Sequence, residues 1–146
     1  MAGQISETEV LNFASTAKDA WKGHCIEAFE FASRLAPRWG SRETFRFCIE
    51  NLGHKAPRVK WESAKVVANL ASNFPEDARK AIPFLLSNSE HEGTVVRWSA
   101  ATALAAIYQT HPSNSLELAA AMEAITLREE KDSIKKIYRK ALGNKK

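Results

Sequence analysis

The sequence is poor in cysteine and in the two residues that usually interrupt helices. Its 146 residues include six glycines, five prolines and two cysteines. Hydrophobic residues make up 45% and form alanine runs such as AATALAA, a balance that favours helices packed closely through small side chains. Cys25 and Cys48 fit no metal-binding or redox spacing and are too few for a disulfide framework. We interpret both as small core residues in a reducing compartment.

Signals for membrane insertion and for catalysis are also missing. No apolar run approaches the length that crosses a membrane, and the first ten residues, MAGQISETEV, have no apolar signal core. We therefore expect a soluble, cytoplasmic protein with no membrane partner. The sequence contains no G-x-S-x-G, no H-E-x-x-H, no glycine-rich phosphate loop and no cysteine visibly paired with a histidine. These absences lead us to expect no enzymatic activity and no cofactor.

The excess of positive charge is confined to one end of the chain. The formal net charge is +4, yet residues 128–146 hold eight Lys or Arg against three Asp or Glu, while residues 1–127 hold 13 against 14. A basic last helix more often reflects solubility and favourable charge near a helix C-terminus than a binding tail. The charge therefore does not by itself indicate a nucleic-acid partner.

The most informative feature is an internal repeat. The segment 59–74, VKWESAKVVANLASNF, recurs 37 residues later as 96–110, VRWSAATALAAIYQT. The alignment pairs Trp61 with Trp98, and it also pairs alanines one and two turns further along. A self-match at this period is typical of α-solenoids, in which stacked helical units share one core.

Capping signals and apolar spacing predict eight helices in a single domain, residues 1–146. The helices group into four antiparallel pairs at about 6–35, 41–73, 75–109 and 114–142. Later helices are expected to begin at Asn73-Phe74-Pro75-Glu76 and at a capping pair formed by Asn114 and Glu117, and Pro83 is expected to bend the fifth helix. The fold class is therefore an all-α solenoid.

The first pair carries more specific expectations. It begins at the capping box Ser6-Glu7-Thr8-Glu9 and breaks at Trp21-Lys22-Gly23. Apolar spacing assigns Phe13, Phe31 and Leu35 to buried faces. Of the two tryptophans outside the repeat, Trp21 is expected in the core and Trp39 over a loop.

The third pair resembles a HEAT repeat. The segment Ala81-Ile82-Pro83-Phe84-Leu85-Leu86, a polar turn, and then Val95-Val96-Arg97 followed by Ala100-Ala101 and Ala103-Leu104 match the family pattern, in which a proline bends the first helix and a Val-Arg pair opens the second. The second pair lacks the interior proline, and the turn SNSEHEG lacks the aspartate common in the family. The resemblance implies a HEAT-like or armadillo-type α-solenoid of about four pairs.

HEAT-like proteins mostly act as non-enzymatic scaffolds that bind another protein or peptide through a concave face lined by the second helix of each pair. Carried onto this chain, the resemblance places the following side chains on that face: Glu27, Glu30, Arg34, Glu62, Lys65, Asn69, Ser99, Thr102 and Gln109, with Lys136, Arg139 and Lys140 at one end. Acids dominate the first repeats and bases the last. Such a surface suits a protein or peptide of mixed charge, and the oligomeric state stays open.

Trp61 and Trp98 have two readings. They can form an aromatic ladder on the concave face that anchors a peptide or stacks on a base. Alternatively, each indole packs over the small Ala68 or Ala105 and the adjoining helix, and we favour this structural reading because an equivalent residue in each repeat indicates a shared packing need. His54 and His91 also recur 37 residues apart, but neighbouring repeat turns lie about 10 Å apart, so we expect turn residues and no metal site.

The alternative function is nucleic-acid binding, with Arg97, Lys136, Arg139 and Lys140 as phosphate contacts. The helical pattern is similar to that of the HEAT-like DNA alkylation repair glycosylases, which use tryptophans and an acidic residue on the concave face. Here Lys65 and Thr102 stand one turn after the two tryptophans, where a catalytic carboxylate would be expected. Arg97 also has a structural reading, in which it neutralises acids of a neighbouring turn.

Overall fold

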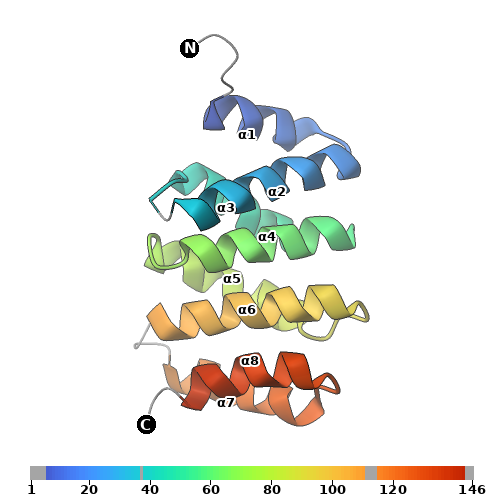
Figure 1. Ribbon diagram of the computed structural model, residues 1–146, viewed down its shortest axis with the longest axis vertical. Coiled ribbons are helices and arrows are strands. Elements are labelled where there is room, and N and C mark those ends of the chain that lie inside the picture. The colour runs from blue at the N-terminus through green and yellow to red at the C-terminus, as the bar shows by residue number, and fades with distance from the viewer. Residues whose placement is uncertain (1–5, 37, 111–114, 144–146) are drawn as a thin grey trace.

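A computed structural model of the chain describes residues 6–36, 38–110 and 115–143, and these contain eight α-helices and no strand. The helices are α1 (Glu7–Thr16), α2 (Asp19–Leu35), α3 (Arg42–Asn51), α4 (Pro57–Leu70), α5 (Pro75–Asn88), α6 (Thr94–Thr110), α7 (Ser115–Arg128) and α8 (Asp132–Gly143). They stack in chain order along one axis, with α1 and α8 at opposite ends (Figure 1). None of these helices is both long enough and apolar enough to span a bilayer.

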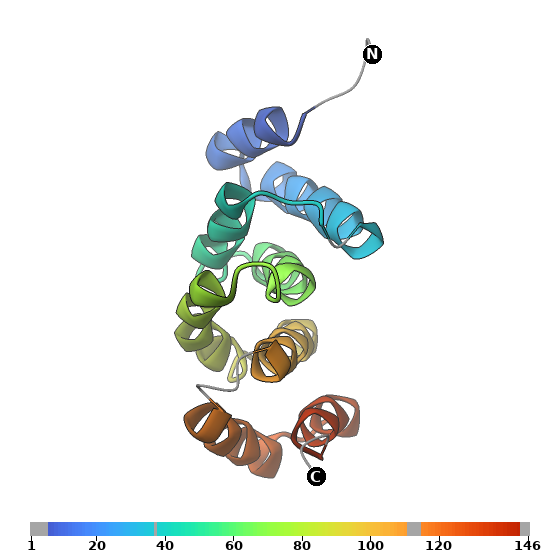
Figure 2. The ribbon, with the colours of Figure 1, turned by 90° about the vertical axis from the view of Figure 1, so that its left-hand side faces the viewer.

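The helices form two layers. Figure 2 shows α1, α3, α5 and α7 on one side of the column and α2, α4, α6 and α8 on the other. The column is bowed, and the even-numbered helices lie on its hollow side. The most extensive contacts join α4 with α6 and α2 with α4, so the even-numbered helices form a continuous ridge.

Helix starts follow local chemistry. The Ser6 hydroxyl accepts the Glu9 backbone N–H at 3.1 Å, which confirms the first predicted cap, and Ser41 caps α3 in the same way. Pro57 and Pro75 occupy first turns, where a missing N–H costs nothing. α5 begins at Pro75, within the predicted start 73–76, and its N-cap is Phe74, whose side chain provides no capping hydrogen bond. The predicted cap at Asn114 falls outside the described residues.

The predicted helix break at Trp21-Lys22-Gly23 is also wrong. The chain breaks earlier, at Ala17 and Lys18, and α2 runs without interruption through Gly23. Gly23 is buried where α4 crosses, and a Cβ placed there would lie 3.2 Å from Cδ of Arg58. The glycine therefore permits a close approach between helices instead of ending one.

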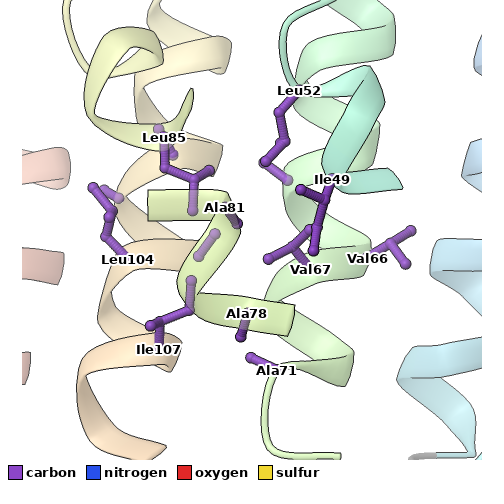
Figure 3. Close-up of a cluster of buried hydrophobic side chains, with 14 of the residues drawn as sticks. Ile49, Leu52, Val66, Val67, Ala71, Ala78, Ala81, Leu85, Leu104 and Ile107 are labelled. Carbon is purple, nitrogen blue, oxygen red and sulfur yellow. The ribbon is translucent and has the colours of Figure 1, made fainter. Parts of the chain in front are cut away.

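One hydrophobic core runs through the stack. Figure 3 shows Ile49 of α3, Leu52 directly after that helix, Val67 of α4, and Leu85 of α5 facing Leu104 of α6. Each of these side chains is buried, as is Cys48, and burial raises the pKa of the Cys48 thiol well above its ordinary value. The buried residues form one cluster from Ile26 in α2 to Ala141 in α8, which is the continuous core expected of a solenoid.

His54 and His91 have the same role in successive turns. Nδ1 of His54 accepts the backbone N–H of Ala56 at 3.0 Å, and Nδ1 of His91 accepts that of Gly93 at 2.8 Å. Each imidazole thus closes the turn before an even-numbered helix. Among the described residues no group of three or more His, Cys, Asp or Glu is arranged to hold a metal ion.

Candidate binding surface

The open surface of the ridge is made by residues that recur every 37 positions. They lie opposite the buried face of each even-numbered helix and therefore point to the hollow side of the column (Figure 2). We call this set the inner face, and all its members are exposed or half-buried: His24, Ala28, Phe31 and Leu35 of α2; Trp61, Lys65 and Ala68 of α4; Trp98, Thr102, Ala105 and Gln109 of α6.

The two repeat tryptophans both belong to the inner face but differ in exposure. Trp61 is half-buried, whereas the Trp98 residue is 40% exposed. In both repeats an alanine two turns further on, Ala68 or Ala105, is half-buried against the core. Each indole is therefore partly covered, and Trp98 keeps a substantial surface free.

Phe31 and Leu35 are exposed, contrary to the sequence-based prediction. Their exposed fractions are 56% and 64%, and the Arg34 guanidinium lies 5.4 Å from the centre of the Phe31 ring. Phe13 and Trp21, also predicted to be buried, are 54% and 61% exposed. Phe31 and Leu35 lie on the inner face, whose members in α4 and α6 are also exposed or half-buried. Trp39 is half-buried, with its ring 5.7 Å from that of Phe29.

A hollow lies between α2 and α4 on this side. Its walls combine an aromatic ring with charges of both signs, and its lining residues are His24, Glu27, Ala28, Glu30, Phe31, Arg34 and Lys65. The acids already have partners within the chain. Glu30 accepts Nε of Arg34 at 3.1 Å, and Glu27 accepts an Arg58 guanidinium nitrogen at 3.1 Å. The hollow therefore offers a mixed surface without a large excess of either charge.

Glu62 does not lie on the open surface, which corrects the prediction. It is 2% exposed and points toward α2, on the same side of α4 as Arg58 and Asn69, both of which contact α2. One carboxylate oxygen accepts Nζ of Lys65 at 3.1 Å, and the other has no hydrogen-bond partner. A buried acceptor without a partner is costly, so Glu62 reduces the stability of the joint between α2 and α4.

Ser99 and Glu30 are also buried, and neither is available to a partner as predicted. Ser99 follows Glu62 by 37 residues, and its hydroxyl donates to the Val95 carbonyl of its own helix at 2.9 Å. Asn69 is half-buried and donates to the Glu30 carbonyl and to the Ser33 hydroxyl across the joint. Asn69 therefore joins α4 to α2, the Ser99 hydroxyl bonds within its own helix, and Glu30 contributes to the wall of the hollow while paired with Arg34.

Arg97 is occupied by internal contacts, so it is not free to hold a phosphate as predicted. Its Nε and one terminal nitrogen donate to the two carboxylate oxygens of Glu129, at 3.1 and 3.4 Å. Its other terminal nitrogen donates to the carbonyls of His91 and Glu92, each at 3.0 Å. Burial by itself raises the pKa of Glu129, but the Lys131 and Glu130 amides and Arg97 outweigh it and hold that pKa below its ordinary value.

The remaining predicted phosphate contacts lie on α8. Lys136, Arg139 and Lys140 are exposed, and in the described part of the chain none of them forms an ion pair. They make the last helix the basic end of the ridge.

Comparison with known proteins identifies the architecture. No family model matches the sequence, and no curated protein matches it. Among solved structures, the chain is similar to a designed armadillo repeat protein, YIII(Dq)4CqI, with a TM-score of 0.72 and 15% sequence identity. The match covers 93% of this chain and 63% of the designed protein, so this chain spans less than two thirds of that protein's length. The comparison confirms the predicted fold: the chain is an all-α solenoid of the armadillo type, with about four antiparallel helix pairs.

Proposed function

We propose that the chain is a non-enzymatic scaffold that binds an extended segment of another protein across its inner face. The observation that carries this proposal is the exposure of Phe31 and Trp98 on the hollow side of the ridge, with the mixed-charge hollow beside Phe31. Aromatic side chains that keep a large surface exposed provide apolar anchors at protein interfaces.

The charges around these rings fit a peptide better than a uniform polyanion. Glu27, Arg34 and Lys65 line the hollow together, so a bound segment meets donors and acceptors within a short distance. Backbone amides and carbonyls of an extended peptide can use both kinds of group. A uniform polyanion would meet the carboxylate of Glu27 as well as the cations.

No catalytic step is part of the proposal. Lys65 and Thr102 follow the two tryptophans by one turn, and neither side chain carries a carboxylate. The Thr102 hydroxyl donates to the Trp98 carbonyl at 3.1 Å, as a helix-surface threonine commonly does.

The proposal is tested with peptides selected from a random display library on the intact chain. Phe31→Ala and Trp98→Ala should each weaken the selected peptides about tenfold, the size expected for an aromatic anchor. Phe84→Ala is the matched control, because Phe84 is 42% exposed, close to the 40% of Trp98, but lies on α5 in the other layer. Equal affinities for all three variants would contradict the inner face as the binding surface.

Nucleic-acid binding is the second candidate, favoured by the exposed cations Lys136, Arg139 and Lys140 of α8, which form no ion pair with any residue that the structure describes. Titration of short DNA and RNA at two salt concentrations tests it, because phosphate contacts release counterions and binding must weaken steeply as salt rises. Lys136→Glu combined with Lys140→Glu should abolish that binding. If no binding is seen at low salt, this candidate is wrong.

A further inference from the structure

The helix α7 presents an apolar stripe on the face that points away from the core. The stripe consists of Leu116, Ala120, Ala124 and Leu127, all exposed, and spacings of four, four and three residues place them on one side of the helix. The two leucines are 87% and 88% exposed, the highest values among large apolar side chains in the described ranges. The opposite side of α7 buries Met122 and its neighbours in the core.

The residue types of the stripe follow the same order when they are read from either end of the helix. A leucine stands at each end and two alanines stand between them, with the midpoint near residue 122. When two such helices pack antiparallel about a two-fold axis, Leu116 meets Leu127 of the other copy and Ala120 meets Ala124 of the other copy. A two-fold interface requires a self-complementary surface, and this stripe meets that requirement. The central alanines allow the two backbones to approach closely.

Charge supports the same arrangement. Glu117 and Arg128 lie on the same flank of the stripe and nearly equally far from its midpoint. In an antiparallel two-fold pair, this flank of both copies lies on the same side of the two helices. Glu117 of each copy therefore comes beside Arg128 of the other. The Arg128 guanidinium is held in place within its own chain, because the Ser89 hydroxyl and carbonyl accept it at 3.0 and 3.3 Å and Glu90 pairs with it at 3.7 Å.

We propose that a second copy of this chain binds through α7, forming an antiparallel, two-fold symmetric dimer. α7 lies in the layer opposite the ridge, so the inner face stays open in the dimer and the inference is independent of the proposed function (Figure 2). One helix from each copy is a small interface compared with the roughly 800 Å² per partner of stable complexes. A dissociation constant on the order of 10 to 100 µM is therefore expected.

Sedimentation equilibrium of the intact chain over a concentration series tests the proposal. The expected result is a monomer–dimer equilibrium for the wild type, and a monomer for Leu116→Glu and for Leu127→Glu. Trp21→Glu is the control: it also places a charge at a large exposed side chain, 61% exposed, but at the other end of the column, and it should leave dimerisation unchanged. Circular dichroism checks that each variant is folded.

Cross-linking tests the direction of the helices. In a Cys25→Ser background, a mixture of Ala120→Cys and Ala124→Cys chains should form a disulfide-linked heterodimer faster than either variant forms a homodimer. Glu123 lies beside the midpoint and meets its own copy across the axis, so Glu123→Gln should tighten the dimer several-fold. A wild type that stays monomeric, assemblies larger than a dimer, or homodimers that cross-link as fast as the mixture would each overturn the proposal.

Discussion

Arg97 and Glu129 form a two-pronged ion pair that joins the third helix pair to the fourth. Both carboxylate oxygens of Glu129 accept the guanidinium, and the side chains are 17% and 2% exposed. Arg97 also donates to two carbonyls of the turn before α6, and Glu129 accepts the amides of the turn before α8. This pair therefore fixes the turn before α6 to the turn before α8. The planar guanidinium of arginine is suited to this contact because two of its nitrogens can donate to one carboxylate at the same time.

Removing one partner of this pair should destabilise the fold more than removing both. Glu129→Ala leaves the Arg97 charge buried without a carboxylate and should lower the free energy of unfolding by roughly 3 kcal/mol. The double variant Arg97→Met, Glu129→Ala should lose less stability than Glu129→Ala alone, and so less than the sum of the two single variants. Urea unfolding of the four proteins gives the coupling, and additive losses would contradict a direct interaction.

The same carboxylate should contribute to stability in a pH-dependent way. The pKa of Glu129 is lowered in the folded chain, so below the ordinary value of 4.5 the unfolded state binds protons more readily. The stabilisation is present above that value and is lost as the pH falls through the lower folded pKa. The difference in unfolding free energy between wild type and Glu129→Gln should be largest at neutral pH and shrink in acid. A difference that grows in acid would contradict the assignment.

Gly40 should not tolerate a side chain. Its φ of +105° lies in a region that other residues rarely adopt, and an added Cβ would stand 2.8 Å from Cδ1 of Leu70. Gly40→Ala should therefore reduce the free energy of unfolding by roughly 1 to 3 kcal/mol. Gly143→Ala is the control, because an added Cβ there meets nothing within 4 Å. Thermal unfolding of both variants checks the difference.

Leu104 should be among the most sensitive core positions. It is fully buried on α6, where Figure 3 shows it opposite Leu85 of α5. Leu104→Ala should cost roughly 2 to 5 kcal/mol through lost burial and the cavity that remains. Leu35→Ala removes the same atoms from a side chain that is 64% exposed and should change stability by less than about 0.5 kcal/mol. Similar losses in chemical denaturation would be incompatible with the described core.

The stack of helix pairs could be predicted from the sequence because the 37-residue repeat and the apolar spacing within each helix mark the same buried positions. Trp61 and Trp98 mark a register of 37 residues, and nearly all positions one register apart share their degree of burial in α4 and α6, whereas α2 agrees with them at fewer positions. The same register, extended backwards from Trp61 and Ala68, points to His24 and Phe31 as inner-face residues. We missed them because apolar spacing within the first pair alone favours burial, and a single helix does not show which of its apolar residues contact a neighbouring helix.

The joints between helices could not be predicted from one helix at a time. A helical wheel places Glu62 in the polar arc, but it does not show that this edge of α4 meets α2. We interpreted Gly23 as a helix break for a similar reason. Only the contact with the Arg58 side chain of α4 shows why a glycine stands inside α2. The positions of polar and small residues between two helices are set by contacts between segments distant in sequence, so the pattern of one helix does not predict them.

The indole N–H signals of the tryptophans test the central claim most directly. A ¹⁵N correlation spectrum of the full chain, recorded as a selected peptide is added, reports on each indole separately. Binding across the inner face should shift the signals of Trp98 and Trp61 while the signal of Trp39, packed on Phe29, stays in place. A peptide that binds and leaves both Trp61 and Trp98 unchanged would contradict the account.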